Sequence, residues 1–264
     1  MSLEELYTKT FAKEVGYFTH WLPSAEISLG TVGYLDGQRF IPKSTLQDMG
    51  IAFDPLKDIV EDNAPSSMEF TSNKGVSITV QMAADTKQSV VGVPVGEAGI
   101  GVQFSKEGAF VLRAEKAFEP RIRDVHRIES DIVSAFKAGK WPRAYVVVTQ
   151  LWHAPYMDAL ISEDSNSSLD LKLDAASAAT MPQLGDASAK LSVVRTNGKV
   201  MKLLACQHAY PAFVLAGLKS SRKGKAWNAA AMHADGFEAA GEQFNDEGAE
   251  SYSLSPIHPD DVEI

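Results

Sequence analysis

Strict alternation of apolar and polar residues, in two regions of the chain, is the feature that most constrains the fold. Apolar residues occupy every second position from Val76 to Met82, from Ile100 to Phe104, from Leu169 to Leu173 and from Ala187 to Val193. A period of two places the apolar side chains of a strand on one face and the remaining side chains on the other. The pattern therefore predicts amphipathic β-strands, which are common in antiparallel sheets with one buried face.

Two further segments show the period of a helix. Ser2 and Glu5 have the spacing of a capping box, which predicts a helix from Leu3 to Val15. A second helix is predicted from Arg121 to Ala138, directly after Pro120. Its apolar face would consist of Ile122, Val125, Ile128, Ile132 and Phe136.

A continuous apolar run, RAYVVVTQL at residues 143–151, predicts a central strand that is buried on both faces. Shorter strands are expected at residues 109–115, 199–206 and 212–218. Residues 1–225 are therefore predicted to form one α+β domain, with a twisted, mostly antiparallel sheet and flanking helices. Residues 226–264 contain nine acidic residues and no Lys or Arg, which predicts an acidic, loosely structured C-terminal tail.

Composition excludes several classes of protein. Because Cys206 is the single cysteine, an intramolecular disulfide is excluded and a reducing compartment is expected. The sequence has no signal-peptide pattern and no apolar run of about 18–20 residues, so we expect a cytoplasmic protein without a membrane-spanning helix. Residues 1–225 carry equal numbers of acidic and basic residues, whereas a nucleic-acid-binding protein is normally more basic.

Motifs of known catalytic and cofactor sites are absent from the sequence. It has no GxSxG, P-loop, HExxH or GxGxxG pattern, and no Cys or His spacing typical of a metal site. We therefore expect neither an enzyme nor a bound cofactor or metal. Cys206 with His208, and separately His153, remain as candidates for a cryptic hydrolase site.

Clustered cations are candidates for contacts with anionic lipid. Four of them lie within seven residues immediately before the acidic tail: Lys219, Arg222, Lys223 and Lys225. Lys9 and Lys13 lie on the first predicted helix. A cation close to an anionic membrane contributes about 1 kcal/mol to binding. An ordinary solvated protein face would have the same composition, so both interpretations remain open.

The order of these elements resembles the pore-forming N-terminal domain of gasdermins, and most of all the short fungal gasdermin-like regulators of cell death. An amphipathic N-terminal helix and a first alternating region (residues 75–115) are followed by a helix and the strand AYVVVTQL (residues 144–151). A second alternating region (residues 169–194) and two strands, KVMKLLACQHA and PAFVLAGLK, complete the pattern. The resemblance covers most of residues 1–220 as an order of elements with a few short similarities.

Two departures from the family are visible. Bacterial gasdermins tend to carry a cysteine near the N-terminus for acylation, and this chain has none there. Mammalian gasdermins carry a large inhibitory C-terminal domain, whereas only about forty residues follow Lys225 here. The second departure fits the fungal type, which resembles the pore-forming domain alone.

The resemblance implies a cytoplasmic protein that moves to the inner face of the plasma membrane and binds anionic phospholipid. It also implies an oligomer of identical copies, or one formed with a divergent allelic homologue, that inserts β-hairpins as a barrel and causes lytic cell death in allorecognition (heterokaryon incompatibility) or defence. From the charge pattern, the lipid-binding candidates are Lys9, Lys13, Lys219, Arg222, Lys223 and Lys225. From the alternation, the membrane-inserting candidates are Val76, Ile78, Val80, Ile100, Val102, Phe104, Leu169, Leu171, Leu173, Ala189, Leu191 and Val193.

Two alternatives from other functional classes remain open. The alternating strands are equally compatible with a soluble lipid- or ligand-binding module whose strands never leave the folded sheet. The second alternative is a hydrolase with a cryptic site at His153 or at Cys206 and His208, because residues of a catalytic triad need not be close in sequence.

Overall fold

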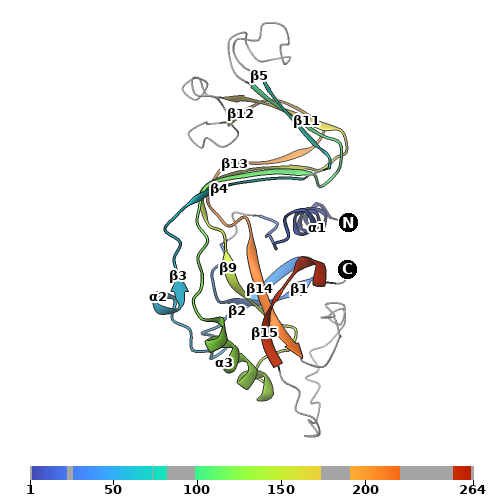
Figure 1. The fold of residues 1–264 in the computed structure, drawn as a ribbon. Coiled ribbons are helices and arrows are strands. Elements are labelled where there is room, and N and C mark those ends of the chain that lie inside the picture. Colours follow the sequence, from blue (N-terminus) through green and yellow to red (C-terminus); the bar gives the residue numbers. More distant parts are fainter. Residues whose placement is uncertain are drawn as a thin grey trace.

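Antiparallel sheets and two main helices make up the fold (Figure 1). The computed structural model describes residues 2–22, 26–72, 74–81, 99–173, 191–220 and 252–262. Adjacent strands in these residues pair in the antiparallel direction, and few residues are helical, in agreement with the predicted α+β class. The strands are divided among three sheets, A, B and C, where a single sheet was predicted.

Sheet A contains the predicted central strand. Its order is β15-β14-β9-β1-β2, so β9 (Val146–Leu151) lies between β14 (Phe213–Ser220) and β1 (Thr31–Asp36). The side chains of Val146, Val147 and Val148 are fully buried, as the continuous apolar run predicts. The other strands of this sheet are β2 (Arg39–Thr45), β15 (Tyr252–Ile257), β3 (Ile59–Val60) and β8 (Arg121–Ile122).

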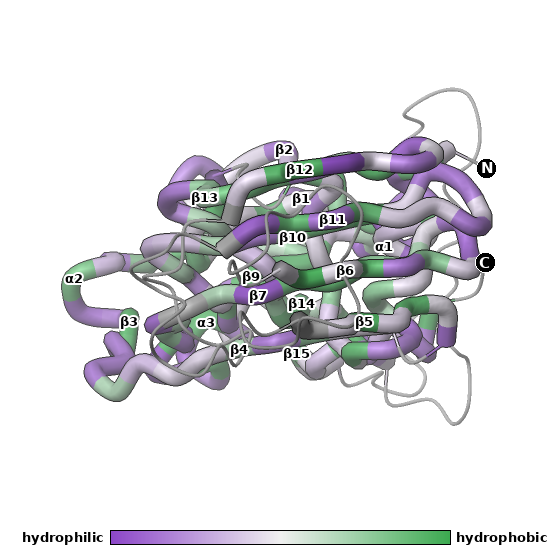
Figure 2. Tube along the Cα trace, turned by 90° about the horizontal axis from the view of Figure 1, so that it is seen from above, coloured by the Kyte–Doolittle hydropathy of each residue, from purple (hydrophilic) through white to green (hydrophobic). Residues whose placement is uncertain are grey.

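Sheets B and C have matching strand orders. Sheet B has the order β13-β10-β7-β4, and sheet C the order β12-β11-β6-β5. Seen from above in Figure 2, the strands of sheet C lie side by side across the molecule. The bounds in sheet B are β4 (Ser66–Thr71), β7 (Phe110–Ala117), β10 (Ala154–Ser162) and β13 (Val200–Ala209). The bounds in sheet C are β5 (Val76–Gln81), β6 (Gly99–Phe104), β11 (Ser167–Leu173) and β12 (Leu191–Asn197).

Helix α1 (Leu3–Val15) lies between sheet A and sheet B (Figure 1). The predicted capping box is confirmed: Ser2 Oγ accepts the Glu5 backbone N–H at 3.2 Å, and Glu5 Oε2 accepts the Ser2 N–H at 2.8 Å. Tyr7 and Phe11 are fully buried against the face of sheet B that carries Phe110 and Leu112. The apolar stripe of α1 is therefore part of the protein core.

Helix α3 (Val125–Lys137) begins later than predicted. The Asp124 side chain accepts the Arg127 backbone N–H and so starts the helix at Val125. Ile122, predicted on the helix, belongs to β8, and the prediction of a helix from Arg121 was wrong at this end. Ile128 and Ile132 pack into the core of sheet A. The remaining short helices are α2 (Pro55–Asp58) and the 3₁₀ helix η2 (Pro259–Asp261).

Strand β10 was missed because it has no alternation. Met157, Ala159 and Ile161 face the core that contains α1, whereas Leu160 faces the core beneath sheet C. Residues 159–162 are buried on both faces of the strand, so no polar side produces a period of two there. The strands β1, β2 and β4 were missed as well.

Part of the predicted loosely structured tail belongs to the fold, which corrects that prediction for residues 252–262. Strand β15 pairs with β14 at the edge of sheet A, and η2 follows it. Glu129 of α3 accepts the Leu254 N–H at 3.0 Å, and Gln38 Nε2 donates to the Pro259 carbonyl at 2.8 Å. The predicted boundary at residue 225, and residues 226–251, lie outside the described residues.

Candidate functional site

Each strand of sheet B continues directly into a strand of sheet C through a short corner. The pairs are β4 with β5, β7 with β6, β10 with β11, and β13 with β12. One residue at each corner has a positive φ: Gly75 (120°), Gly108 (72°), Asn166 (63°) and Gly198 (76°). Glycine adopts this region without steric cost, and asparagine tolerates it better than most residues. Sheets B and C are therefore one four-stranded arrangement that bends sharply along a row of four corners.

Buried serines satisfy backbone groups where the two ladders end. Ser72, Ser162 and Ser167 are almost completely inaccessible to solvent. Ser72 Oγ accepts the Phe110 N–H at 3.1 Å, and Ser162 Oγ donates to the Asp164 carbonyl at 2.6 Å. A hydroxyl can replace a missing ladder partner, so the corners are stable without continuous sheet pairing.

Eight of the predicted membrane-inserting residues have described side chains, and these share one face of sheet C. Residues directly opposite each other in an antiparallel pair point to the same side. The register aligns Val76 with Phe104, Ile78 with Val102 and Leu169, and Ile100 with Leu171 and Val193. For Val80, Leu173 and Leu191 only the backbone pairing is described, and it continues the same register. Ala189, the remaining candidate, lies outside the described residues.

The opposite face of sheet C is polar or small. It carries Ser77, Thr79, Gly101, Gln103, Ser168, Asp170 and Lys172, at positions that alternate with the apolar residues. Strands of transmembrane β-barrels show the same alternation, with apolar side chains toward lipid and polar side chains toward the lumen. The arrangement is thus chemically suited to separate an apolar from an aqueous phase.

In the described fold the apolar face of sheet C is covered by sheet B. Ile100, Val102 and Leu169 form one buried cluster with Val111 and Leu160 of sheet B. The edge strand β12 is the exception, because Val193 retains 40% of its exposure. Any function that uses this face on a membrane requires sheet C to move away from sheet B.

The predicted lipid-binding cations lie on two different elements. Lys9 and Lys13 are one turn apart on α1, where Lys13 is exposed. Lys219 is on β14, and its Nζ lies 3.4 Å from Asp261 Oδ2 of η2. The His258 backbone N–H lowers the pKa of the Asp261 carboxyl group, burial opposes this effect, and Lys219 lowers the pKa further. Arg222, Lys223 and Lys225 lie outside the described residues.

The hydrolase candidates take part in ring stacking. The imidazoles of His153 and His208 are nearly parallel, with centroids 5.9 Å apart, and His153 also stacks on Tyr210 at 5.0 Å. Cys206 Sγ is 3.9 Å from the Gln207 carbonyl oxygen. Strand β13 has positive φ at Ala205 and His208, so its backbone is irregular on both sides of Cys206.

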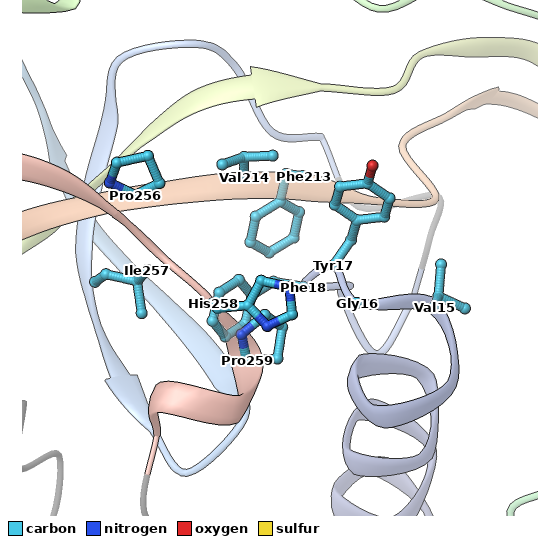
Figure 3. A pocket seen from close by; sticks show the side chains of 10 residues that line it. All are labelled: Val15, Gly16, Tyr17, Phe18, Phe213, Val214, Pro256, Ile257, His258 and Pro259. Atoms are coloured by element: carbon cyan, nitrogen blue, oxygen red, sulfur yellow. The ribbon is translucent and has the colours of Figure 1, made fainter. Parts of the chain in front are cut away.

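A pocket of about 380 Å³ lies where the end of α1, the start of β14 and the β15–η2 segment meet (Figure 3). Its lining is mainly apolar and aromatic: Val15, Gly16, Tyr17, Phe18, Phe213, Val214, Pro256, Ile257, His258 and Pro259. Within the described ranges, no group of three or more His, Cys, Asp or Glu side chains is arranged to hold a metal ion. None of the helices described in the structure is both long and apolar enough to cross a membrane.

The corner residues were missed as a functional feature by sequence reasoning. Gly108 and Gly198 each lie between two predicted strands, and Gly75 directly precedes one, so all three indicate turns. Glycine occurs both where a chain reverses in a hairpin and where it bends at a corner, so the sequence does not show which of the two is present.

Comparison with known proteins gives one structural neighbour of note. No protein-family model and no curated protein matches the chain. Among solved structures, the cryo-EM structure of the Gasdermin A3 membrane pore matches at 12% sequence identity, over 82% of this chain and 80% of that chain. The TM-score is 0.22. The chain is thus loosely similar to the structure of a gasdermin pore.

Proposed function

We propose that the chain is a pore-forming protein that inserts sheet C into a membrane as two β-hairpins. The observation that carries this proposal is the division of sheet C into an apolar and a polar face. The division is regular in β5, β6 and β11, and a bulge in the pairing of β11 with β12 interrupts it where Thr196 lies opposite Leu169. One hairpin contains β5 and β6, and the other contains β11 and β12. In lipid, hairpins of this kind satisfy all their backbone hydrogen bonds only when they close into a barrel.

Strand length indicates that the corners take part in insertion. A transmembrane strand needs about 9–11 residues, whereas β5 and β6 have 6 residues each and β11 and β12 have 7. Strands β6 and β7 together run from Gly99 to Ala117, and β10 and β11 from Ala154 to Leu173. Straightening a corner would join such a pair into a strand of sufficient length. Sheet C would also have to leave its contacts with Val111 and Leu160.

Barrel closure implies several copies of the chain. Strands β5 and β12 are the two edges of sheet C in the described residues, and each has one unpaired row of backbone groups. Pairing of β12 of one copy with β5 of the next would continue the sheet around a ring. The second copy would be identical or a divergent allelic homologue. In this proposal the protein acts from the cytoplasm at the inner face of the plasma membrane and causes lytic cell death.

Anionic phospholipid is the proposed membrane partner. Lys13 is an exposed cation of α1, and Lys9 lies on the same helix face. Lys219 would have to leave Asp261 in order to bind a lipid phosphate. Arg222, Lys223 and Lys225 are the other proposed lipid-binding cations of this segment. Each Lys or Arg near an anionic surface contributes about 1 kcal/mol to binding, so several cations are needed for stable binding.

Dye release from liposomes, with and without anionic lipid, tests the proposal. Val193→Asp places a charge on the apolar face at an exposed position, so the soluble fold tolerates it. A charge in the lipid-facing band costs up to about 2–4 kcal/mol for Lys or Arg and less for Asp, and every subunit of the ring adds this cost, which predicts loss of leakage. Ser192→Asp is the matched control, because it adds the same charge to the polar face of the same strand, opposite Lys172.

The expected result is leakage that depends on anionic lipid in the parent chain and in Ser192→Asp, and no leakage in Val193→Asp. Equal leakage from the two variants would show that the apolar face of sheet C does not enter lipid. Absence of leakage from the parent chain, alone and with a divergent allelic homologue, would contradict pore formation altogether.

A second candidate function is binding of a small apolar molecule in the pocket at the end of α1. Its volume lies at the lower end of the range of ligand pockets, about 300–1,000 Å³. Val214→Trp would fill the pocket, and a fluorescent fatty acid that binds the parent chain should then bind at least tenfold more weakly. Unchanged binding, or none to the parent chain, would remove this candidate.

A further inference from the structure

Four chain segments connect sheet A with sheet B, and together they form what we call the neck. They are residues 61–65, 118–120, 152–153 and 210–212, and they lie to the left of α1 in Figure 1. Sheets B and C are joined to the strands of sheet A through these segments. Any movement of the bent sheet relative to sheet A must therefore change the neck.

Hydrogen bonds join the four segments side by side. Asp62 Oδ2 accepts the Glu119 N–H at 3.0 Å, which ties the first segment to the second. Phe118 and His153 exchange two backbone hydrogen bonds, at 2.8 and 2.9 Å, which tie the second segment to the third. The Trp152 N–H donates to the Ala212 carbonyl at 2.9 Å and completes the row.

His153 lies at the centre of this row. Its ring stacks on His208, nearly parallel at 5.9 Å, and on Tyr210, at 5.0 Å. Its Nε2 is buried, and within the described residues it has no hydrogen-bond partner. A neutral imidazole tolerates this environment. An imidazolium would need an acceptor for a second N–H and would hold its charge close to the ring of His208.

Burial and the titratable groups around the neck together set the pKa of His153. Burial is the main factor that lowers the pKa of His153, and His208 lowers it further, while Glu61 acts in the opposite direction. Glu26 acts on Tyr210 rather than on His153. Asp62 has its pKa lowered by the backbone N–H groups of Ala64 and Glu119, and so it remains ionised until the solution is strongly acidic.

We infer that the neck is an acid-sensitive joint: proton uptake by His153 breaks the ring stack and loosens the bent sheet from sheet A. A histidine with a lowered pKa in the folded state stabilises that state fully above its ordinary value of 6.5, and the contribution falls as the pH drops below it. Asp62 adds a second loss below its ordinary value of 3.8. The inference rests on the neck alone and holds whether or not the chain forms pores.

Amide hydrogen exchange of the full chain at pH 5.0 to 7.5 tests the inference. The protection factors of Phe118 and residue 153 should fall by up to tenfold per pH unit below 6.5, because one proton is taken up on opening. His153→Phe retains an aromatic ring without a titrating group and should remove this pH dependence. His126→Phe is the matched control on α3, where the imidazole is 94% exposed, and it should behave like the parent chain.

Protection that is independent of pH in the parent chain, or an equal pH dependence in His153→Phe, would overturn the inference. A direct titration covers the case in which His153→Phe fails to fold. The Cε1 proton of His153, followed by NMR in the unmodified chain, should titrate with a midpoint below 6.5. A midpoint at or above 6.5 would show that the folded neck accepts the proton freely.

Discussion

Replacement of Gly108 by alanine probes the contact between the corner row and α1. Gly108 has a φ of 72°, and an added Cβ would lie 2.5 Å from Leu6 Cγ and 2.9 Å from Leu6 Cδ2. A left-handed non-glycine residue costs about 1–2 kcal/mol, and overpacking adds about 1–3 kcal/mol. We therefore expect Gly108→Ala to lower the free energy of unfolding by about 2–5 kcal/mol.

Two controls separate backbone strain from packing. Gly37 has a φ of 56°, and nothing lies within 4 Å of an added Cβ, so Gly37→Ala should cost only the backbone part. In a Leu6→Ala background, Gly108→Ala should likewise lose its packing part, because the clashing side chain is gone. Urea unfolding followed by circular dichroism gives all the free energies.

Equal losses of stability in Gly108→Ala and Gly37→Ala would refute the reasoning. That result would mean that Leu6 moves aside without cost and that α1 does not support the corner. A difference of more than about 1 kcal/mol that disappears in the Leu6→Ala background would show that α1 packs against the corner in solution.

The remaining predictions concern the C-terminal segment. Leu254 is 6% exposed in the core of sheet A, so Leu254→Ala should lower the free energy of unfolding by about 2–5 kcal/mol. Leu56 is 94% exposed, so the control Leu56→Ala should change the free energy of unfolding by no more than about 0.5 kcal/mol. A loss in Leu254→Ala as small as that in Leu56→Ala, measured by urea unfolding, would contradict the docking of β15. Lys219→Ala removes the partly exposed ion pair with Asp261 and should lower the free energy of unfolding by no more than about 1 kcal/mol. A larger loss in the same assay would contradict the expectation that a partly exposed ion pair contributes little to stability.

Local sequence patterns were sufficient to predict which faces of these helices and strands are apolar. The capping box of Ser2 and Glu5, the buried strand β9 and the apolar face of sheet C all follow from residues that are neighbours in the chain. The start of α3 was placed too early because Ile122 continues the helical period by chance, while the Asp124 cap sets the observed start at Val125.

The partners of those faces were decided by tertiary structure alone. A period of two in β6 indicates which side of the strand is apolar, but not that Val111 and Leu160 of sheet B cover it. Gly108 indicates a turn, but not that the chain bends from sheet C into sheet B there, nor that Leu6 of α1 packs against the corner. Strand β15 (Tyr252–Ile257) pairs with β14, although the composition of this part of the chain indicates a loosely structured tail. Propensity and periodicity act over a few residues, whereas burial requires a second apolar surface, and the sequence does not mark which surface that is.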